Sequence, residues 1–85
     1  MPYIPKTRRE LLYPSIEALA DRVLVGKEDG ELNYIICSLV QSLYRTDYHS
    51  LNAAIGVLEC AKQEIYRRMV APYEDKKISE NGDVF

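Results

Sequence analysis

The residues of this chain best suited to chemistry are carboxylates, amides and tyrosines, which lie in two apolar stretches, residues 31–44 and 51–70. Paired carboxylates can act in acid–base steps or bind a divalent cation, which makes Glu59 and Glu64 the first pair to consider. Their five-residue spacing places them about 140° apart on a helix, so one helix cannot direct both at one atom. We therefore expect ion pairs on a solvated helix surface, such as Glu64 with Arg68, and no catalytic pair.

A ligand site at a dimer interface is the alternative hypothesis for these side chains. Asn33 and Asn52 begin two helices that a short loop turns into a hairpin, so the two amides lie at opposite heights within one chain. An antiparallel dimer could bring them together. The simpler interpretation is that each amide bonds a neighbouring loop. The candidate ligand-binding residues are Glu31, Asn33, Asn52, Glu59 and Tyr66.

Metal-binding and nucleophilic patterns are weak in this sequence. The two cysteines form no CxxC pair and there is a single histidine, which is too few ligands for a zinc site in one chain. The stretch from Glu74 to Asp83 is acidic but lacks the ligand spacing of a calcium loop. His49 has no cysteine or serine partner at a recognisable spacing. We expect no metal and no cofactor, and we favour a non-catalytic protein. The alternative is a small enzyme or a metal- or nucleotide-binding protein with its site at a dimer interface.

Basic pairs raise the alternative of a nucleic-acid-binding protein. They occur at residues 8–9, 67–68 and 76–77, and seven tyrosines could stack on bases. Acidic residues lie beside each pair, however, and the net charge is −2. No positive field attracts a polyanion, so we expect no nucleic-acid partner.

The apolar spacing predicts a long third helix from about Leu51 to Val70, the central element of the fold. Its apolar and small residues cover more than half of the circumference, which predicts contacts on two sides. Gly56 costs about 1 kcal/mol relative to alanine in a helix, which suggests a packing reason, although the residue could simply be tolerated. Pro72 should stop or kink this helix. The main stripe consists of Leu51, Ala54, Ile55, Leu58, Ile65 and Met69.

Two further helices should pack against the central one. The first opens at Pro14 and Ser15 and ends at Gly26, and the second begins after an Asp29 cap and ends near residues 44–46. Asp47 or Ser50 should cap the third helix. Because the link between the second and third helices is short, they should be antiparallel neighbours.

The two ends of the chain are expected to be less regular. Residues 1–12 should form an extended segment or a short helical turn, with Tyr3 and Ile4 free to dock on the bundle. Residues 73–85 should form a short helix and a tail. Val84 and Phe85 should pack on the bundle or on a partner chain, because bare apolar termini are unfavourable in water.

The cysteines should lie at about the same height on the hairpin. Cys37 lies eleven residues before Tyr48 and Cys60 twelve after it. A disulfide is sterically conceivable, but a reducing cytosol favours two free, buried thiols.

The length of the chain limits the core that it can form. A single domain of 85 residues buries only roughly 60–65% of its unfolded surface, so oligomerisation would add the missing burial. We expect a homodimer. The chain lacks a secretory signal pattern and an apolar run of ~20 residues, which predicts a cytoplasmic protein without a membrane span.

Three segments carry a resemblance to a known family. They are GELNY at residues 30–34, NAAIGVLEC at 52–60 and APYEDKKISENGDV at 71–84. On these segments the chain resembles a small uncharacterised family of bacterial and viral proteins of about this length. The resemblance covers nearly the whole chain and implies a discrete domain, but no activity.

Together these observations predict one all-α domain over residues 1–85. It is a small helical bundle built on an antiparallel helix hairpin with a long central third helix. The function class that we favour is a non-catalytic interaction or regulatory module that acts as a homo-oligomer and can bind a protein partner.

Overall fold

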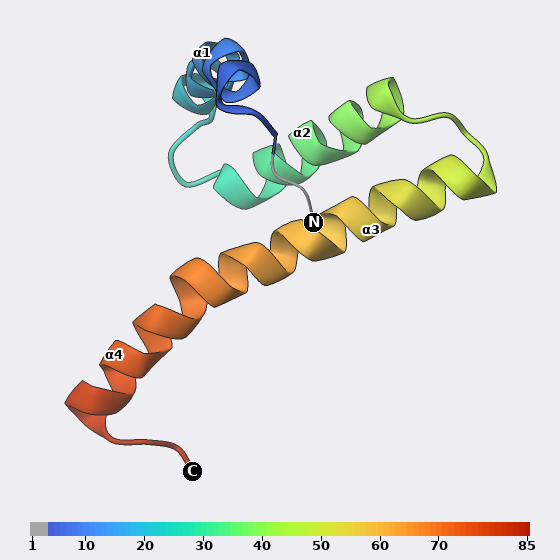
Figure 1. Cartoon of the computed structure of the whole chain (residues 1–85). Helices are drawn as coiled ribbons and strands as arrows, with labels where there is room; N and C mark the ends of the chain where they lie inside the picture. The colour runs from blue at the N-terminus through green and yellow to red at the C-terminus, as the bar shows by residue number, and fades with distance from the viewer. Residues whose placement is uncertain (1–3) are drawn as a thin grey trace. The chain divides into compact units, whose positions relative to one another are not determined.

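Every regular element in residues 4–85, the part of the chain that the computed structural model describes, is helical (Figure 1). The elements are α1 (Lys6–Arg22), α2 (Glu28–Leu43), α3 (Tyr48–Ile65), a π-helical turn η1 (Tyr66–Val70) and α4 (Ala71–Asn81). This confirms the predicted all-α class. The chain divides into two compact units, of which the first ends at Leu39 and the second runs from Val40 to Phe85. The antiparallel hairpin and the single domain stay predictions.

Helix α1 begins at Lys6 and not at Pro14, so the prediction that residues 6–12 are extended or form a separate turn is wrong. Pro14 lies inside the helix. A proline there costs about 3 kcal/mol, but the residues before it, Lys6 to Leu12, are mostly strong helix formers. The Pro5 carbonyl accepts hydrogen bonds from the N–H groups of Arg8 and Arg9 at 3.0 and 3.1 Å, which closes the first turn. Tyr3 lies outside the described residues, and Ile4 is exposed.

The corner between α1 and α2 is closed by carboxylates of α2. Glu31 accepts a hydrogen bond from the N–H of Leu24 at 3.0 Å, and Glu28 accepts one from the N–H of Gly26 at 3.1 Å. Gly26 has φ +85°, a left-handed conformation that glycine adopts without steric cost, and it lies in this corner instead of ending α1. The two helices cross steeply, since Figure 1 shows α1 nearly along its axis while α2 runs across the page.

Helix α2 starts one residue before the expected Asp29 cap, at Glu28. Its first turn contains Glu28, Asp29 and Glu31, whose negative charges interact favourably with the positive end of the helix dipole. Helix α3 starts at Tyr48, three residues before the predicted Leu51. Asp47 is its cap, as predicted, and accepts a hydrogen bond from the Ser50 N–H at 2.8 Å.

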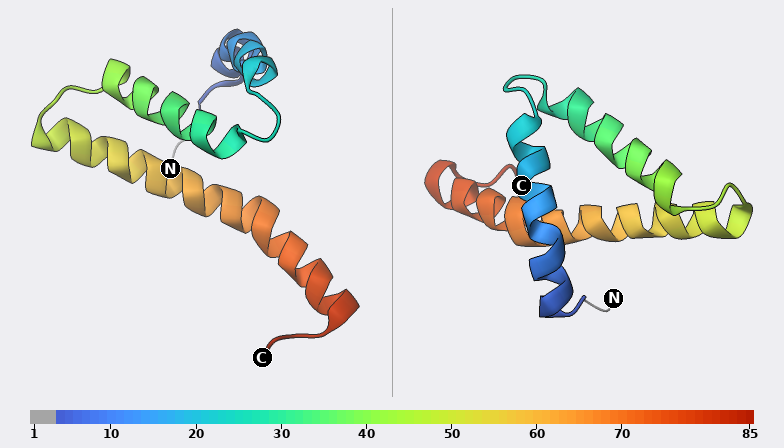
Figure 2. Two further views of the ribbon diagram at one scale, coloured as in Figure 1. Left: turned by 180° about the vertical axis from the view of Figure 1, so that it is seen from behind. Right: turned by 90° about the horizontal axis from the view of Figure 1, so that it is seen from above.

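Pro72 neither stops nor sharply breaks the third helix, because a π turn precedes it. The N–H of Ala71 donates a hydrogen bond to the carbonyl of Tyr66, five residues earlier. In a regular α-helix it would donate to the carbonyl four residues earlier. In a regular α-helix the ring of Pro72 would clash with the carbonyl four residues before it, and the wider turn relieves that crowding. The ribbon therefore continues from α3 into α4 with a change of direction (Figures 1 and 2).

The residues after α4 are exposed in this structure. Helix α4 ends at Asn81, and Gly82 follows with φ +87°. Its N–H bonds to the Ile78 carbonyl at 2.8 Å, and the chain then turns back (Figure 2). Val84 and Phe85 are exposed, and their expected packing on the bundle or on a partner chain stays a prediction.

Burial within the chain is slight. Among residues 4–85 the one buried hydrophobic residue is Ala54, which is 2% exposed. The predicted stripe of α3 is present, but most of its large side chains remain accessible. Within the second unit, no other element covers α3 on two sides. The expected packing of the other helices against α3 stays a prediction.

Candidate interaction surface

The two candidate ligand-binding residues of α2, Glu31 and Asn33, form local hydrogen bonds. The Glu31 carboxylate is bonded to the N–H of Leu24, as described above. Asn33 accepts a weak hydrogen bond from the Cys37 thiol, with a distance of 3.9 Å from Sγ to Oδ1. The Asn33 contact lies within its own helix and not with a neighbouring loop. The ligand-site hypothesis and the simpler interpretation of the amides both stay predictions.

The three candidates of the second unit are spaced by seven residues, with Asn52 and Glu59 on one face of α3 and Tyr66 at the start of the π turn η1. Successive members lie about 10 Å apart along the axis, at 1.5 Å per residue, so they do not converge on one ligand. Glu59 accepts a hydrogen bond from Gln63 at 3.3 Å and pairs with Lys62 at 3.3 Å. The Gln63 amide and the Lys62 ammonium hold the pKa of Glu59 below its ordinary value. Asn52 is exposed.

Tyr66 makes a contact that the sequence did not predict. Its hydroxyl donates to Glu74 at 2.9 Å, across the π turn. This hydrogen bond to the carboxylate raises the pKa of Tyr66, because the phenol proton is held by a negative partner. Residues eight apart do not share a face of a regular helix, so periodicity could not find the pair. The feature of the sequence that could have indicated this contact is Pro72, because a helix that meets a proline must widen or break.

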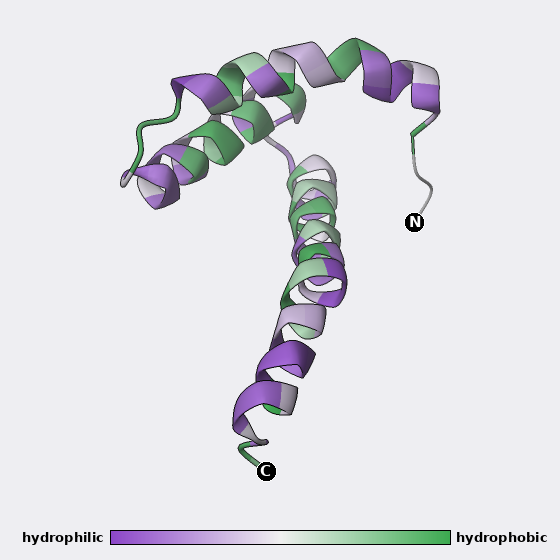
Figure 3. Cartoon of the chain, turned by 90° about the vertical axis from the view of Figure 1, so that its left-hand side faces the viewer, coloured by the Kyte–Doolittle hydropathy of each residue, from purple (hydrophilic) through white to green (hydrophobic). Residues whose placement is uncertain are grey.

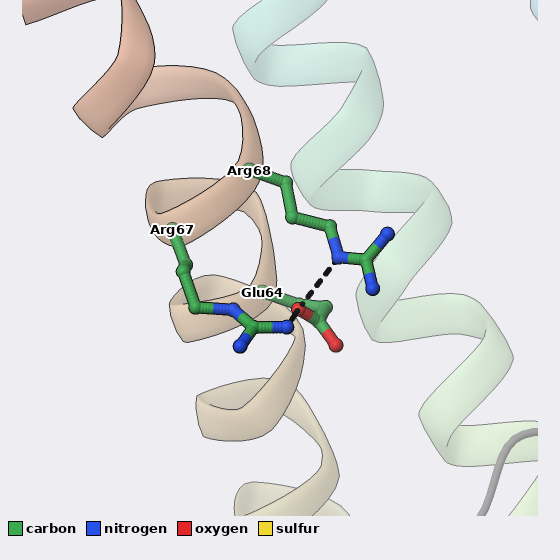
Figure 4. A network of polar contacts seen from close by, with 3 residues as sticks. All are labelled: Glu64, Arg67 and Arg68. Atoms are coloured by element: carbon green, nitrogen blue, oxygen red, sulfur yellow. Dashed lines mark hydrogen bonds and ion pairs between the residues drawn. The ribbon is translucent and has the colours of Figure 1, made fainter.

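Glu64 forms ion pairs with two arginines. It pairs with Arg67 at 3.3 Å and with Arg68 at 3.2 Å, and its side chain is 27% exposed (Figure 4). The Glu64–Arg68 pair was predicted, and the pair with Arg67 was not. Glu59 and Glu64 thus bind separate partners, as their angular separation requires. The pairing also reduces the positive field of the Arg67–Arg68 pair that the nucleic-acid hypothesis used.

Both cysteines are free and exposed, which corrects the prediction that they are buried. They lie on helices whose neighbouring side chains are also largely accessible. In the described part of the chain, no group of three or more His, Cys, Asp or Glu side chains could hold a metal ion. Within residues 4–85, every helix is too short or too polar to span a lipid bilayer.

The concave surfaces offer little for a small ligand. An open hollow of about 400 Å³ lies between α1 and α2, with Leu19, Tyr34 and Ile35 in its lining. Its charged groups are Arg22 and Glu31, and the latter is already bonded to the backbone. Another hollow, of about 500 Å³, lies between α4 and the terminal residues, with Tyr73, Lys77 and Phe85 in its lining. Lys77 there lies 5.6 Å from the centre of the Tyr73 ring and 3.2 Å from Glu80.

Large apolar side chains are exposed on several helices of the structure. They recur along α1, α2 and α3, and Figure 3 shows apolar segments along α3 and a more polar α4. On α3 and the following π turn they include Leu51, Ile55, Ile65 and Met69. A surface of this kind is typical of a protein that binds another protein.

Comparisons with known proteins agree with the resemblance found in the sequence. No curated protein matches the chain, and no solved structure matches it. One family model, described as a domain of unknown function (DUF6899), matches residues 1–84. The match covers all three segments that carried the resemblance. The chain therefore belongs to the family described as domain of unknown function DUF6899.

Proposed function

We propose that this chain is a non-catalytic interaction module of the cytoplasm that acts as a homo-oligomer, in its simplest form a dimer. The observation that carries the proposal is a row of exposed apolar side chains in the second unit. Leu51 and Ile55 of α3 are 42% and 65% exposed, and Ile65 and Met69 are 53% and 68% exposed. Apolar side chains gathered along one helix are typical of a surface that binds another protein.

A second copy of the chain is the simplest partner for this row, because each copy offers the same apolar helices and a two-fold axis pairs a surface with itself. A chain of 85 residues forms only a small core, so burial between copies would add to its stability.

The test is the solution mass of the wild-type chain by light scattering over a hundredfold range of concentration. We expect about twice the chain mass throughout, together with weak binding of a dye that reports exposed apolar surface. A thermal-shift screen with divalent ions and nucleotides on the same sample should leave the melting temperature unchanged. A monomer that one of these ligands stabilises would contradict the proposal and favour the ligand site of Glu31, Asn33, Asn52, Glu59 and Tyr66.

A further inference from the structure

The π turn lies directly before Pro72, where the long helix of the second unit loses a backbone hydrogen bond. Proline has no N–H, so residue 72 cannot donate to the preceding turn. The N–H of Ala71 donates to the carbonyl of Tyr66 and closes the π turn. The ribbon changes direction here, between α3 and α4 (Figure 2). A helix bends most easily where such a bond is lost, so residues 66–72 form the hinge between α3 and α4.

A hydrogen bond between two side chains spans this hinge. The hydroxyl of Tyr66, before Pro72, donates to the carboxylate of Glu74, after it, at 2.9 Å. The ion pairs of Glu64 with two arginines, by contrast, lie wholly before Pro72. A contact that lies on one side of a hinge does not restrain it. The hydrogen bond from Tyr66 to Glu74 restrains bending, because its two ends lie on opposite sides.

This contact depends on the π turn. Eight residues advance a regular α-helix by about 800°, which would leave Tyr66 and Glu74 about 80° apart around the axis. The π turn takes up one extra residue and reduces this difference to about 20°. The hydrogen bond therefore favours the conformation that contains the π turn. A contact that distinguishes two conformations raises the population of the one in which it forms.

The chemistry of the pair suits a stable contact. A hydrogen bond to an ionised carboxylate is stronger than one between two neutral groups. The hydrogen bond to Glu74, and the negative charges of Glu74 and Asp75, raise the pKa of Tyr66 above its ordinary value of 10.0. The phenol therefore keeps its proton at neutral pH, and the bond keeps its donor.

We propose that the hydrogen bond from Tyr66 to Glu74 is a latch on the proline hinge, which holds the π turn and fixes the direction of α4 relative to α3. When the latch is open, α4 bends about Pro72 and takes a range of directions. The angle between the two helices thus responds to any change in the Tyr66 hydroxyl or the Glu74 carboxylate. The latch acts within one chain, so it does not depend on the proposed self-association.

The first test removes the hydroxyl and measures opening of the π turn. Tyr66→Phe removes only the donor of the latch, and Tyr73→Phe, in the first turn of α4, is the matched control that removes the same group. Amide hydrogen exchange of Ala71, followed by nuclear magnetic resonance, reports opening of the turn. We expect the exchange rate to rise at least fivefold in Tyr66→Phe and in Glu74→Ala, and less than twofold in Tyr73→Phe. Equal rates in the wild type and Tyr66→Phe would overturn the inference.

The second test measures the direction of α4 with two spin labels. One label is attached to the native Cys60, which is exposed in α3, and the other to Ser79→Cys in α4. Cys37→Ser removes the other native thiol, and an excess of unlabelled protein ensures that the measured distances lie within one chain. Tyr66→Phe should broaden the distance distribution, whereas Tyr73→Phe should leave it unchanged. A distribution of wild-type width in Tyr66→Phe contradicts the inference.

Pro72→Ala distinguishes a latch on a hinge from an ordinary contact along a helix. Alanine restores the missing backbone donor, so the helix remains continuous without the π turn and without the latch. In this background Tyr66→Phe should change neither the amide exchange of Ala71 nor the distance distribution. An effect as large as in the wild-type background would show that the hydrogen bond supports the helix whichever residue stands at position 72, and the inference would be wrong. Circular dichroism checks that every variant remains helical.

Discussion

At the scale of single residues, the side chains that this fold depends on most are helix caps. Asp47 accepts the Ser50 N–H at 2.8 Å and so satisfies one of the free donors at the start of α3. Asp47→Ala should lower the free energy of unfolding by about 1 kcal/mol, measured by urea denaturation. Asp47→Asn should lower the free energy of unfolding much less. The matched control is Asp83→Ala, in the tail beyond α4, where a loss as large as that of Asp47→Ala would contradict the capping role.

The free energy of unfolding should depend on pH through the carboxyl group of Glu28. Hydrogen bonds from its own N–H and from the N–H of Gly26 lower the pKa of its carboxyl below the ordinary 4.5. A lowered folded-state pKa contributes stability above the unfolded value, and this is lost as pH falls below about 4.5 through the folded-state pKa. Glu28→Gln should therefore be less stable than the wild type at pH 7, and the difference should shrink at pH 3. Glu17→Gln, on the exposed surface of α1, is the control that removes one carboxylate outside this corner.

At the scale of the elements, α1 is the helix whose extent differs most from the prediction. Pro14 in its interior removes one backbone hydrogen bond and crowds the preceding turn. Pro14→Ala should therefore raise the free energy of unfolding by up to about 3 kcal/mol and increase the helical signal in circular dichroism. Unchanged or reduced stability would show that the helix starts at Pro14, where proline is favourable.

Gly56 offers a second test at the scale of elements. An added Cβ would meet nothing within 4 Å in the chain, so the structure supports the interpretation that this glycine is tolerated. Gly56→Ala should stabilise α3 by about 1 kcal/mol, measured by thermal or urea unfolding. It should leave the association constant unchanged. Weaker association of this variant would instead place Gly56 in the interface between copies.

At the scale of the whole molecule, many large apolar side chains of the described residues are exposed. If a second copy supplies the missing burial, the melting temperature must rise with protein concentration, because association stabilises the folded state by mass action. We expect an upward shift of several degrees over a hundredfold increase in concentration, measured by calorimetry. A melting temperature that does not change over this range contradicts obligate association.

The sequence by itself determined the helical class and most helix boundaries near residues 28–48. Local features of the sequence decide these boundaries. Apolar spacing predicts a helix, and Asp47 caps the start of α3. The same rules misplaced the start of α1, because a proline at residue 14 favours a helix start only when the residues before it do not already form a helix. They also placed Glu59 and Glu64 correctly on separate sides, since angular spacing on one helix needs no tertiary information.

Only the three-dimensional structure decided what happens at Pro72 and how little of the chain is buried. A helix that meets a proline can end, kink or widen, and the choice depends on small differences between hydrogen-bond geometries that residue types do not reveal. The π turn, and with it the Tyr66–Glu74 contact, follows from that choice. Apolar periodicity shows which side of a helix avoids water, but not what covers it. Whether the cover comes from the same chain or another is set by how the helices pack, which is a property of the tertiary structure.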